Sequence, residues 1–296
     1  MTEVHVGRGF SPPTPVGGGL KPRPTLDERR YVAGETTTLA RELRDIARSA
    51  HLLRNLVHRD ITIRYKRSVL GFFWTMLHPL LLALILMMVF SSVFRFAVPR
   101  YELYVLAALL PWNFFSQTTV GSMASLAWNG ALMKRVRVPK SIFTLSTVVA
   151  GVANLLLAYI PLLLIMLFRG APIRPALAFL PVSLLLLALF TYGVSLTLSA
   201  LAVYFVDVRE MYNVALTALL YFTPVIYPIE VVPERFRQLF ALNPLLYFIE
   251  IVRAPVHDGV LPSAHALTVA TACALVAVVI GWTVFRRLSR GFYPYL

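Results

Sequence analysis

Charged side chains are almost absent from six long apolar blocks that lie between Phe72 and Phe285. The only ionisable residue well inside one of these blocks is His78. Transporters driven by protons or sodium keep carboxylates or histidines at membrane depth, and so do membrane hydrolases. The missing charges therefore indicate that the energy for this protein's work is supplied by another chain.

Other signatures of chemistry are missing as well. The single cysteine, Cys273, can form no intrachain disulfide. The phosphate-binding pattern G-x-x-x-x-G-K-[ST] does not occur, so we expect no ATP site of the usual kind. The patterns G-x-S-x-G and H-E-x-x-H and any Cys/His metal cluster are absent too. We expect no cofactor, no metal and no catalytic residue.

Hydrophobic residues are what the sequence has in excess. They make up 58% of the 296 residues, whereas about 45–50% is usual in soluble domains. Each block reaches or approaches the ~20 residues with which a helix crosses a membrane. We therefore predict an all-α membrane protein with six transmembrane helices. The blocks are Phe72–Phe94, Leu103–Ala127, Ser141–Phe168, Ala176–Val206, Met211–Ile229 and Ala264–Phe285.

The positive charges predict the orientation. If both termini are cytoplasmic and the chain crosses six times, 21 of the 28 Lys and Arg residues lie on the cytoplasmic side and 7 on the outer side. Cytoplasmic loops of membrane proteins carry such an excess. The net charge of +14 is thereby explained by topology and by attraction to anionic lipid, and nucleic acid is not expected as a partner.

Before the first block we expect a disordered tail over residues 1–35, rich in Pro and Gly, and an amphipathic helix with a basic joint over residues 36–71. Apolar residues recur every three or four positions from Leu39 to Val57, and Arg and His residues form a second stripe at the same spacing. Such a helix suits the membrane–water interface, lying in its plane. A solvated helix that packs on another protein is the alternative.

Two connections stand out within the transmembrane domain, residues 72–285. Residues 129–140 form a short basic cytoplasmic connection, either a helical turn that docks into a soluble partner or a loop that only fixes topology. Residues 230–262 form the largest outer segment, with two stretches too short to span. They are amphipathic enough to enter the membrane as a re-entrant pair, which requires shielding by protein or by a water-filled cavity. Residues 286–296 form a cytoplasmic tail.

Three stretches resemble one family in the same order. Arg59-Asp60, Arg64-Tyr65-Lys66, Ser68-Val69-Leu70-Gly71, Trp74 and His78-Pro79-Leu80 resemble the entry to the first span of ABC-2 type permeases. Leu132-Met133-Lys134 through Pro139 resembles that family's coupling loop, and Pro224, Tyr227-Pro228, Pro233-Glu234 and Asn243-Pro244-Leu245 its re-entrant segment. The most similar branch exports lipid-linked bacterial polysaccharides: O-antigen, capsule and teichoic acid. The tail before Thr36 and the histidine at position 78 depart from the family pattern.

The resemblance implies two copies of this chain and two ATP-hydrolysing subunits in the plasma (inner) membrane. The substrate would be a glycan on a polyprenyl pyrophosphate, threaded outward between the two copies. Arginine forks suit phosphate oxygens, so the expected contacts of the carrier's headgroup are Arg54, Arg59, Arg64, Lys66 and Arg67. The expected contacts of the ATPase are Leu132, Met133, Lys134, Arg135, Val136, Arg137 and Pro139.

A sliding sugar chain needs flat apolar faces and hydroxyl partners, which aromatic side chains supply. The candidates for lining a channel are Phe72, Phe73, Trp74, Trp112, Phe114, Phe115, Tyr204, Tyr221, Phe222 and Tyr227. Two alternatives stay open from sequence alone. One is a drug or antibiotic efflux permease of the same broad family. The other is a membrane enzyme acting on polyprenyl lipids, for which Asp207 and Glu210 would be the candidate acid and base.

Overall fold

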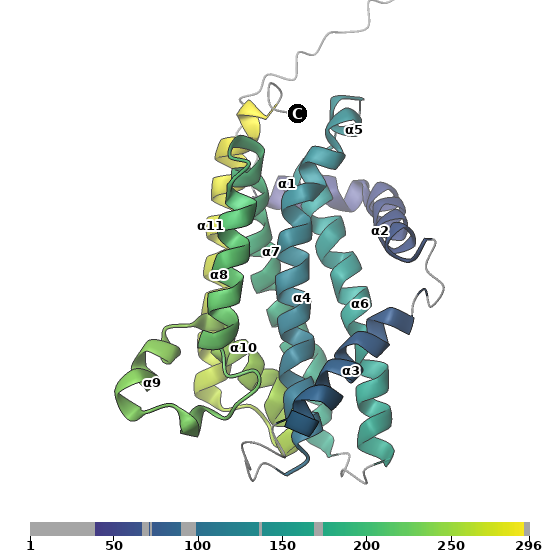
Figure 1. The fold of residues 1–296 in the computed structure, drawn as a ribbon. Helices are drawn as coiled ribbons and strands as arrows, with labels where there is room; N and C mark the ends of the chain where they lie inside the picture. The colour runs from purple at the N-terminus through teal and green to yellow at the C-terminus, as the bar shows by residue number, and fades with distance from the viewer. Residues whose placement is uncertain are drawn as a thin grey trace, which may run out of the picture. The chain divides into compact units, whose positions relative to one another are not determined.

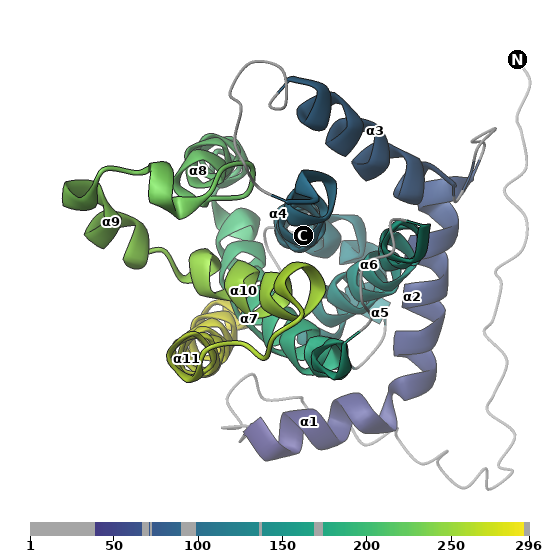
Figure 2. The same cartoon turned by 90° about the horizontal axis from the view of Figure 1, so that it is seen from below.

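A computed structural model describes residues 39–66, 71, 73–89, 99–135, 138–168 and 174–292 of the chain. Within these residues every regular element is a helix. Five long helices run up and down in a bundle, and α4 and α7 lie at its centre (Figures 1 and 2). These helices are α4 (Tyr101–Trp128), α6 (Ser141–Phe168), α7 (Leu180–Tyr204), α8 (Val208–Phe222) and α11 (Ala264–Leu288).

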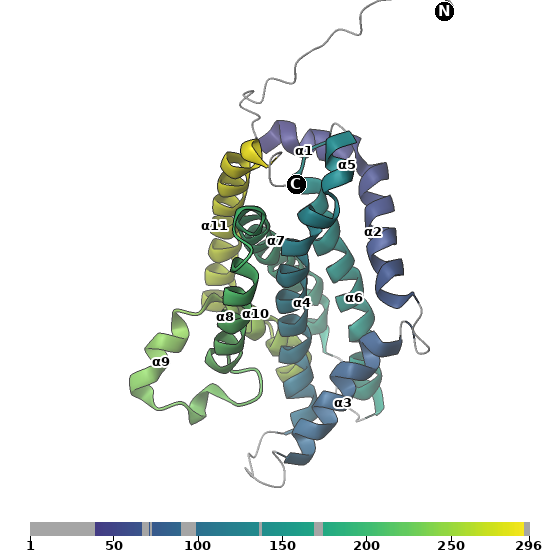
Figure 3. The same ribbon diagram turned by 45° about the horizontal axis from the view of Figure 1, so that its top comes forward.

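Shorter helices lie at the two ends of the bundle. The short helix α5 (Gly130–Arg135) marks one end, here called the α5 end, where the N-terminal helices and the last turn of α11 also lie (Figure 3). The opposite end, called the α10 end, carries α9 (Glu234–Ala241) and α10 (Pro244–Arg253). Helix α3 (Phe73–Val89) crosses the outside of the bundle obliquely and contacts α4 and α6. Short helical turns cover Pro175–Phe179, Ile229–Val231, Ala254–Asp258 and Ser289–Gly291.

One helix overlaps most of each of the six apolar blocks, and the block Ser141–Phe168 has the same bounds as α6. By length and composition, three helical stretches of the described residues are able to cross a membrane: Ser141–Phe168, Pro175–Tyr204 and Ala264–Gly291. A fourth candidate is the pair Glu234–Ala241 and Pro244–Asp258, which bends by 92°. The predicted total of six spans stays a prediction.

The N-terminal amphipathic segment forms two helices where the pattern predicted one. Helix α1 (Leu39–Arg48) ends before Ser49, and α2 (Ala50–Tyr65) leaves in a new direction (Figure 2). The Ser49 N–H donates to the carbonyls of both Asp45 and Ile46, at 3.0 Å each, which tightens the last turn of α1. The two stripes persist across the break. Ile46 and Leu56 are buried against the bundle, whereas Arg44, Arg48 and Arg54 are exposed.

Helices α7 and α11 make the most extensive contact of any two helices among the described residues, and glycines meet at their crossing. A Cβ atom added at Gly281 would lie 2.1 Å from the Gly193 carbonyl oxygen, and one added at Gly193 would lie 2.3 Å from the Ala277 carbonyl carbon. Small residues allow such contact between backbones in membrane helices. The two helices therefore contact each other backbone to backbone, with no side chain between them at this crossing.

Candidate functional site

The junction between α4 and α5 is tied to α2 by a polar cluster. Arg59 Nη1 donates to Asn129 Oδ1 at 2.7 Å, while Arg59 Nη2 and Nε donate to Asp60 Oδ1 at 2.8 and 3.2 Å. The second oxygen of Asp60 accepts a hydrogen bond of 3.3 Å from Ser146 on α6. Asn129 is buried and donates onward to the Ser125 carbonyl at 2.7 Å. The start of the predicted coupling connection is therefore held to two other helices.

A second cluster joins α1 to the bundle at the α5 end (Figure 3). The two carboxylate oxygens of Glu42 accept one bond each, from Trp282 Nε1 on α11 at 2.5 Å and from the hydroxyl of Ser141, the first residue of α6. Hydrogen bonds to an ionised acceptor are about twice as strong as those between neutral groups. The Glu42 carboxylate thus connects α1, α6 and α11 at one point.

Lys140 links the end of the coupling connection to the C-terminal turn. Its Nζ donates to the Ser289 carbonyl at 2.5 Å and lies 5.3 Å from the centroid of the Phe292 ring. Burial lowers the pKa of the Lys140 ammonium from 10.5. A displacement of residues 138–140 would therefore act on the last turns of the chain as well as on α6.

The predicted coupling residues are only partly exposed. Met133 is buried in an apolar cluster with Leu56, Ile142 and Phe143, and Leu132 and Val138 pack against that cluster. Pro139 is half-buried. The side chains of Lys134 and Arg135 and the whole of Val136 and Arg137 lie outside the described residues. The Met133 side chain therefore anchors α5 to the bundle.

The predicted headgroup contacts fall into different environments. Arg54 is exposed on α2 and Lys66 at its C-terminal cap, and the side chain of Arg54 has no hydrogen bond or ion pair to other described residues. Arg59 is engaged with Asp60 and Asn129. The side chain of Arg64 and the whole of Arg67 lie outside the description. Their role as headgroup contacts stays a prediction.

The predicted channel aromatics are not gathered along one surface. Tyr204 donates to the Leu288 carbonyl at 2.7 Å at the α5 end, whereas Tyr221 is exposed and Tyr227 donates to its carbonyl at the other end of α8. Trp112, Phe114 and Phe115 are buried in the bundle core, where Phe115 stacks on Phe190. Among the predicted channel residues the exposed side chains are those of Phe73, Trp74, Tyr221 and Phe222, and Phe72 lies outside the described residues.

The sequence did not predict a hydrogen-bond network around Arg253 at the α10 end. Arg253 Nη1 donates to the Tyr104 hydroxyl at 2.8 Å, and Nη2 donates to the carbonyls of Pro224 and Val225 at 2.8 and 3.2 Å. Tyr101 donates to the Ile226 carbonyl at 2.6 Å, so α4 and α10 both hold the turn that follows α8. The only sequence signal was an arginine set within the short apolar run Ile251–Val256.

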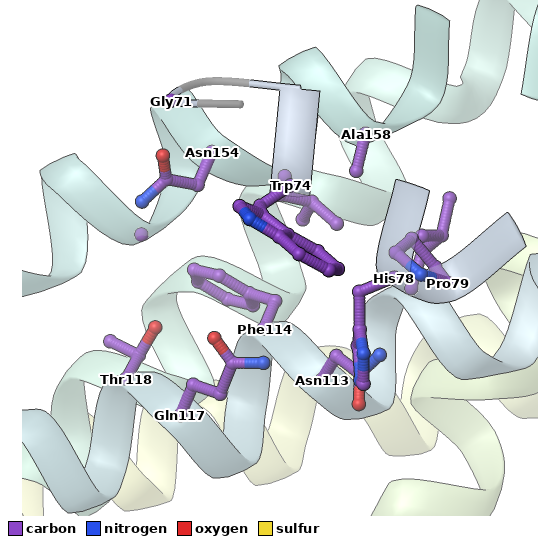
Figure 4. Close-up of a pocket in the computed structure, with 13 residues that line it drawn as sticks. Gly71, Trp74, His78, Pro79, Asn113, Phe114, Gln117, Thr118, Asn154 and Ala158 are labelled. Atoms are coloured by element: carbon purple, nitrogen blue, oxygen red, sulfur yellow. The ribbon is translucent and has the colours of Figure 1, made fainter. Parts of the chain in front are cut away.

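Sequence reasoning also missed a cavity of about 480 Å³ between α3, α4 and α6 (Figure 4). Trp74 and His78 come from α3, Asn113 and Gln117 from α4, and Asn154 from α6. Figure 4 shows the rings of Trp74 and Phe114 and the polar side chains around one common space. The spacing of Asn113 and Gln117, four residues apart, was the available signal, because it places both amides on one helix face.

Comparison with known proteins gives a consistent result. Residues 51–256 match the sequence profile of a family described as "ABC-2 type transporter". The chain is 31% identical over 248 residues, 82% of its length, to the O-antigen export system permease protein RfbA of Myxococcus xanthus, of which it covers 94%. It is 29% identical over 244 residues to a protein of the same name from Klebsiella pneumoniae, with 81% of this chain and 93% of that protein covered. It is also 22% identical over 235 residues to the polysialic acid transport protein KpsM of Escherichia coli, with 77% and 90% covered.

Proposed function

Because the chain belongs to the ABC-2 type transporter family, we propose that it is the permease subunit of an exporter that moves a lipid-linked polysaccharide across the inner membrane. The observation that carries this proposal is the similarity to O-antigen and polysialic acid export proteins over more than three quarters of the chain. The chain is a transport subunit and not an enzyme, and ATP hydrolysis belongs to a separate subunit, in agreement with the absence of a phosphate-binding loop.

The proposed topology has six crossings with the α5 end in the cytoplasm. In this topology α1 and α2 lie at the inner interface, with Arg44, Arg48 and Arg54 exposed to anionic lipid. The outer side carries the pair α9–α10 as the proposed re-entrant segment, and the bend of 92° between Glu234–Ala241 and Pro244–Asp258 supports this assignment. Arg253, Tyr101 and Tyr104 donate to carbonyls of the turn between α8 and this pair, as irregular structure in a membrane requires.

The ATPase acts on the bundle through α5 and the residues after it. Helix α5 is anchored from below by the buried Met133, and its junction with α4 is held by Arg59. Residues 138–140 connect it to α6, and Lys140 connects it to the turn after α11. A displacement of α5 by the ATPase is thereby transmitted to α2, α6 and α11.

The substrate path runs along α4, between α8 and α3, and a second copy of the chain closes it. Figure 2 shows α8 and α3 on either side of α4. Helix α8 presents an exposed apolar stripe of Met211, Val214 and Tyr221, at three- and seven-residue spacing, that a second copy would cover. The carrier's pyrophosphate enters beside Arg54 and Lys66, together with Arg64 and Arg67. Arg59 would have to exchange Asp60 for phosphate to take part.

The test is reconstitution of the chain with its ATPase subunit in proteoliposomes that contain a polyprenyl pyrophosphate-linked oligosaccharide. We expect ATP-dependent transfer of the sugar to the opposite leaflet, measured as sensitivity to an added glycosidase. The chain alone should give no transfer. Transfer or lipid turnover by the chain alone, or ATP-dependent movement of small amphiphilic drugs but not of the oligosaccharide, would overturn the proposal.

A further inference from the structure

The cavity between α3, α4 and α6 has polar groups that the rest of the chain does not use. The side-chain amides of Asn113 and Gln117 make no hydrogen bond to any residue that the structure describes. Each amide offers two donors and one acceptor. Polar groups without a partner at membrane depth are costly, so these amides require water or a polar ligand.

The chemistry of the wall restricts the ligand. Among the described residues that line the cavity none is Asp, Glu, Lys or Arg. His78 is the one titratable side chain among them, so a phosphate or another charged group would find no permanent counter-charge there. An isoprenoid chain would leave the amides without partners. An uncharged ligand with many hydroxyl groups satisfies both conditions.

Aromatic rings complete the site. Trp74 on α3 and Phe114 on α4 both border the space, and their flat apolar faces suit the C–H faces of a sugar ring (Figure 4). A cavity of about 480 Å³ lies in the range of small-molecule sites, which combine apolar walls with a few well-placed polar groups.

The backbone holds this geometry in place. A Cβ atom added at Gly151 on α6 would lie 2.4 Å from Thr118 Oγ1 and 3.0 Å from Phe114 Cε2. Glycine at this position lets α4 and α6 approach closely, and the approach fixes two residues of the wall. Helix packing thus fixes the part of the wall that α4 and α6 form, while Trp74, His78 and Gln117 contribute exposed side chains to the rest.

We propose that this cavity is a binding subsite for an uncharged pyranose unit of the exported glycan, present within each copy of the chain. Trp74 is the stacking platform, and Asn113, Gln117 and Asn154 bond the sugar hydroxyls. The inference rests on the proposed function, since it assigns a position on the transport path to that function's substrate. It predicts that the permease itself distinguishes between sugars.

The experiment uses the complex of this chain with its ATPase subunit, in nanodiscs. Cys273→Ala removes the only native cysteine, and Ala158→Cys places a thiol at the cavity wall. The rate of modification of this thiol by a small neutral methanethiosulfonate is measured with increasing methyl pyranosides (glucoside, galactoside, mannoside and rhamnoside). Farnesyl phosphate is the comparison probe. A thiol at exposed Ala241 on α9 reports non-specific effects.

We expect at least one methyl pyranoside to slow modification at position 158 saturably, by fivefold or more, with no effect at position 241. Gln117→Leu should weaken this protection at least tenfold, and so should Asn113→Leu. Because Gln117 is exposed, its replacement leaves the packing intact. Gln238→Leu on α9 is the matched control and should leave protection unchanged.

The outcomes separate this inference from the function on which it rests. Absence of protection by every pyranoside, in a complex that still exports glycan, would overturn the subsite alone. Protection by farnesyl phosphate and not by pyranosides would make the cavity a lipid groove and also overturn it. Protection by a pyranoside in a complex that exports no glycan would support the subsite and contradict the proposed function.

Discussion

The guanidinium of Arg253 holds the ring of Tyr104 in two ways at once. Its Nη1 donates to the Tyr104 hydroxyl at 2.8 Å, and its central carbon lies 3.7 Å from the ring centroid. The same side chain binds two carbonyls of the turn after α8, while its Nε is buried without a hydrogen-bond partner among the described residues. One side chain therefore fixes the position of α4, α10 and that turn relative to one another.

We predict that Arg253→Lys destabilises the protein although the charge is kept. A lysine has no planar fork, so it cannot reach the Tyr104 hydroxyl and both carbonyls together. Each buried polar group left without a partner costs about 1–3 kcal/mol. The thermal unfolding temperature of the purified protein in detergent should fall clearly.

The control for this prediction is Arg235→Lys, at an exposed arginine on α9 that stacks on Phe236. It should change the free energy of unfolding by about 0.5 kcal/mol or less. Equal unfolding temperatures for Arg253→Lys and Arg235→Lys would show that the hydrogen-bond network of Arg253 does not contribute to stability.

We predict that Gly193→Ala and Gly281→Ala separate α7 from α11. The added methyl groups would meet backbone atoms at 2.3 and 2.1 Å, and backbone cannot rotate away as a side chain can. Overpacking of this kind costs about 1–3 kcal/mol or more. Gly121→Ala on α4 is the matched control, because its Cβ would meet only Thr147 Cγ2 at 3.4 Å. Unfolding of the three variants in detergent measures the difference, and a loss as large for Gly121→Ala would contradict the packing argument.

Replacement of Glu42 should release α1 from the bundle. In Glu42→Gln one of the two accepting oxygens becomes an NH2 donor, so that position no longer accepts from Trp282 or Ser141, and the negative charge that strengthens both bonds is lost. We expect hydrogen exchange of the α1 amides to become at least tenfold faster while exchange in α4 and α7 is unchanged. Trp282→Phe should act in the same direction. Glu210→Gln, at an exposed glutamate of α8, should leave the α1 amides protected. Unchanged hydrogen exchange of α1 in Glu42→Gln would contradict the idea that Glu42 holds α1 to the bundle.

The buried ammonium of Lys140 predicts a dependence of stability on pH. Because burial lowers its pKa in the folded protein from 10.5, the folded protein releases this proton at a lower pH than the unfolded chain. The cost of burying the charge is then fully present below the folded-state pKa and disappears as the pH rises through it towards 10.5. The unfolding temperature of the wild type should therefore improve relative to Lys140→Met across this alkaline window. Lys66→Met, at an exposed lysine, controls for the loss of a positive charge, and a difference that stays constant with pH would contradict the prediction.

The helices could be predicted from the sequence because each apolar block is long and bounded by polar residues. Helix α6 begins at Ser141 and ends at Phe168, as its block does. The break at Ser49 could not be predicted, since neither proline nor glycine marks it and the apolar spacing continues across it. The break depends on how α1 and α2 follow two different sides of the bundle.

Contacts between residues far apart in the sequence could not be predicted from it, for a different reason. Arg253 and Tyr104 are 149 residues apart, and Arg59 and Asn129 are 70 apart. Apolar spacing tells which face of a helix is buried, but it does not tell which helix covers that face. For this reason the sequence predicted neither the bonds of Arg59 to Asp60 and Asn129 nor the contacts of Arg253.

The backbone contact of Gly193 with Gly281 decides where the molecule is able to bend. Two helices whose backbones touch without intervening side chains have no room to slide, so we expect α7 and α11 to keep their relative positions. A cycle that opens and closes a path must then swing the elements that lie on the other side of α4. Helices α3 and α8 are those elements, and we expect them to move while α7 and α11 keep their positions.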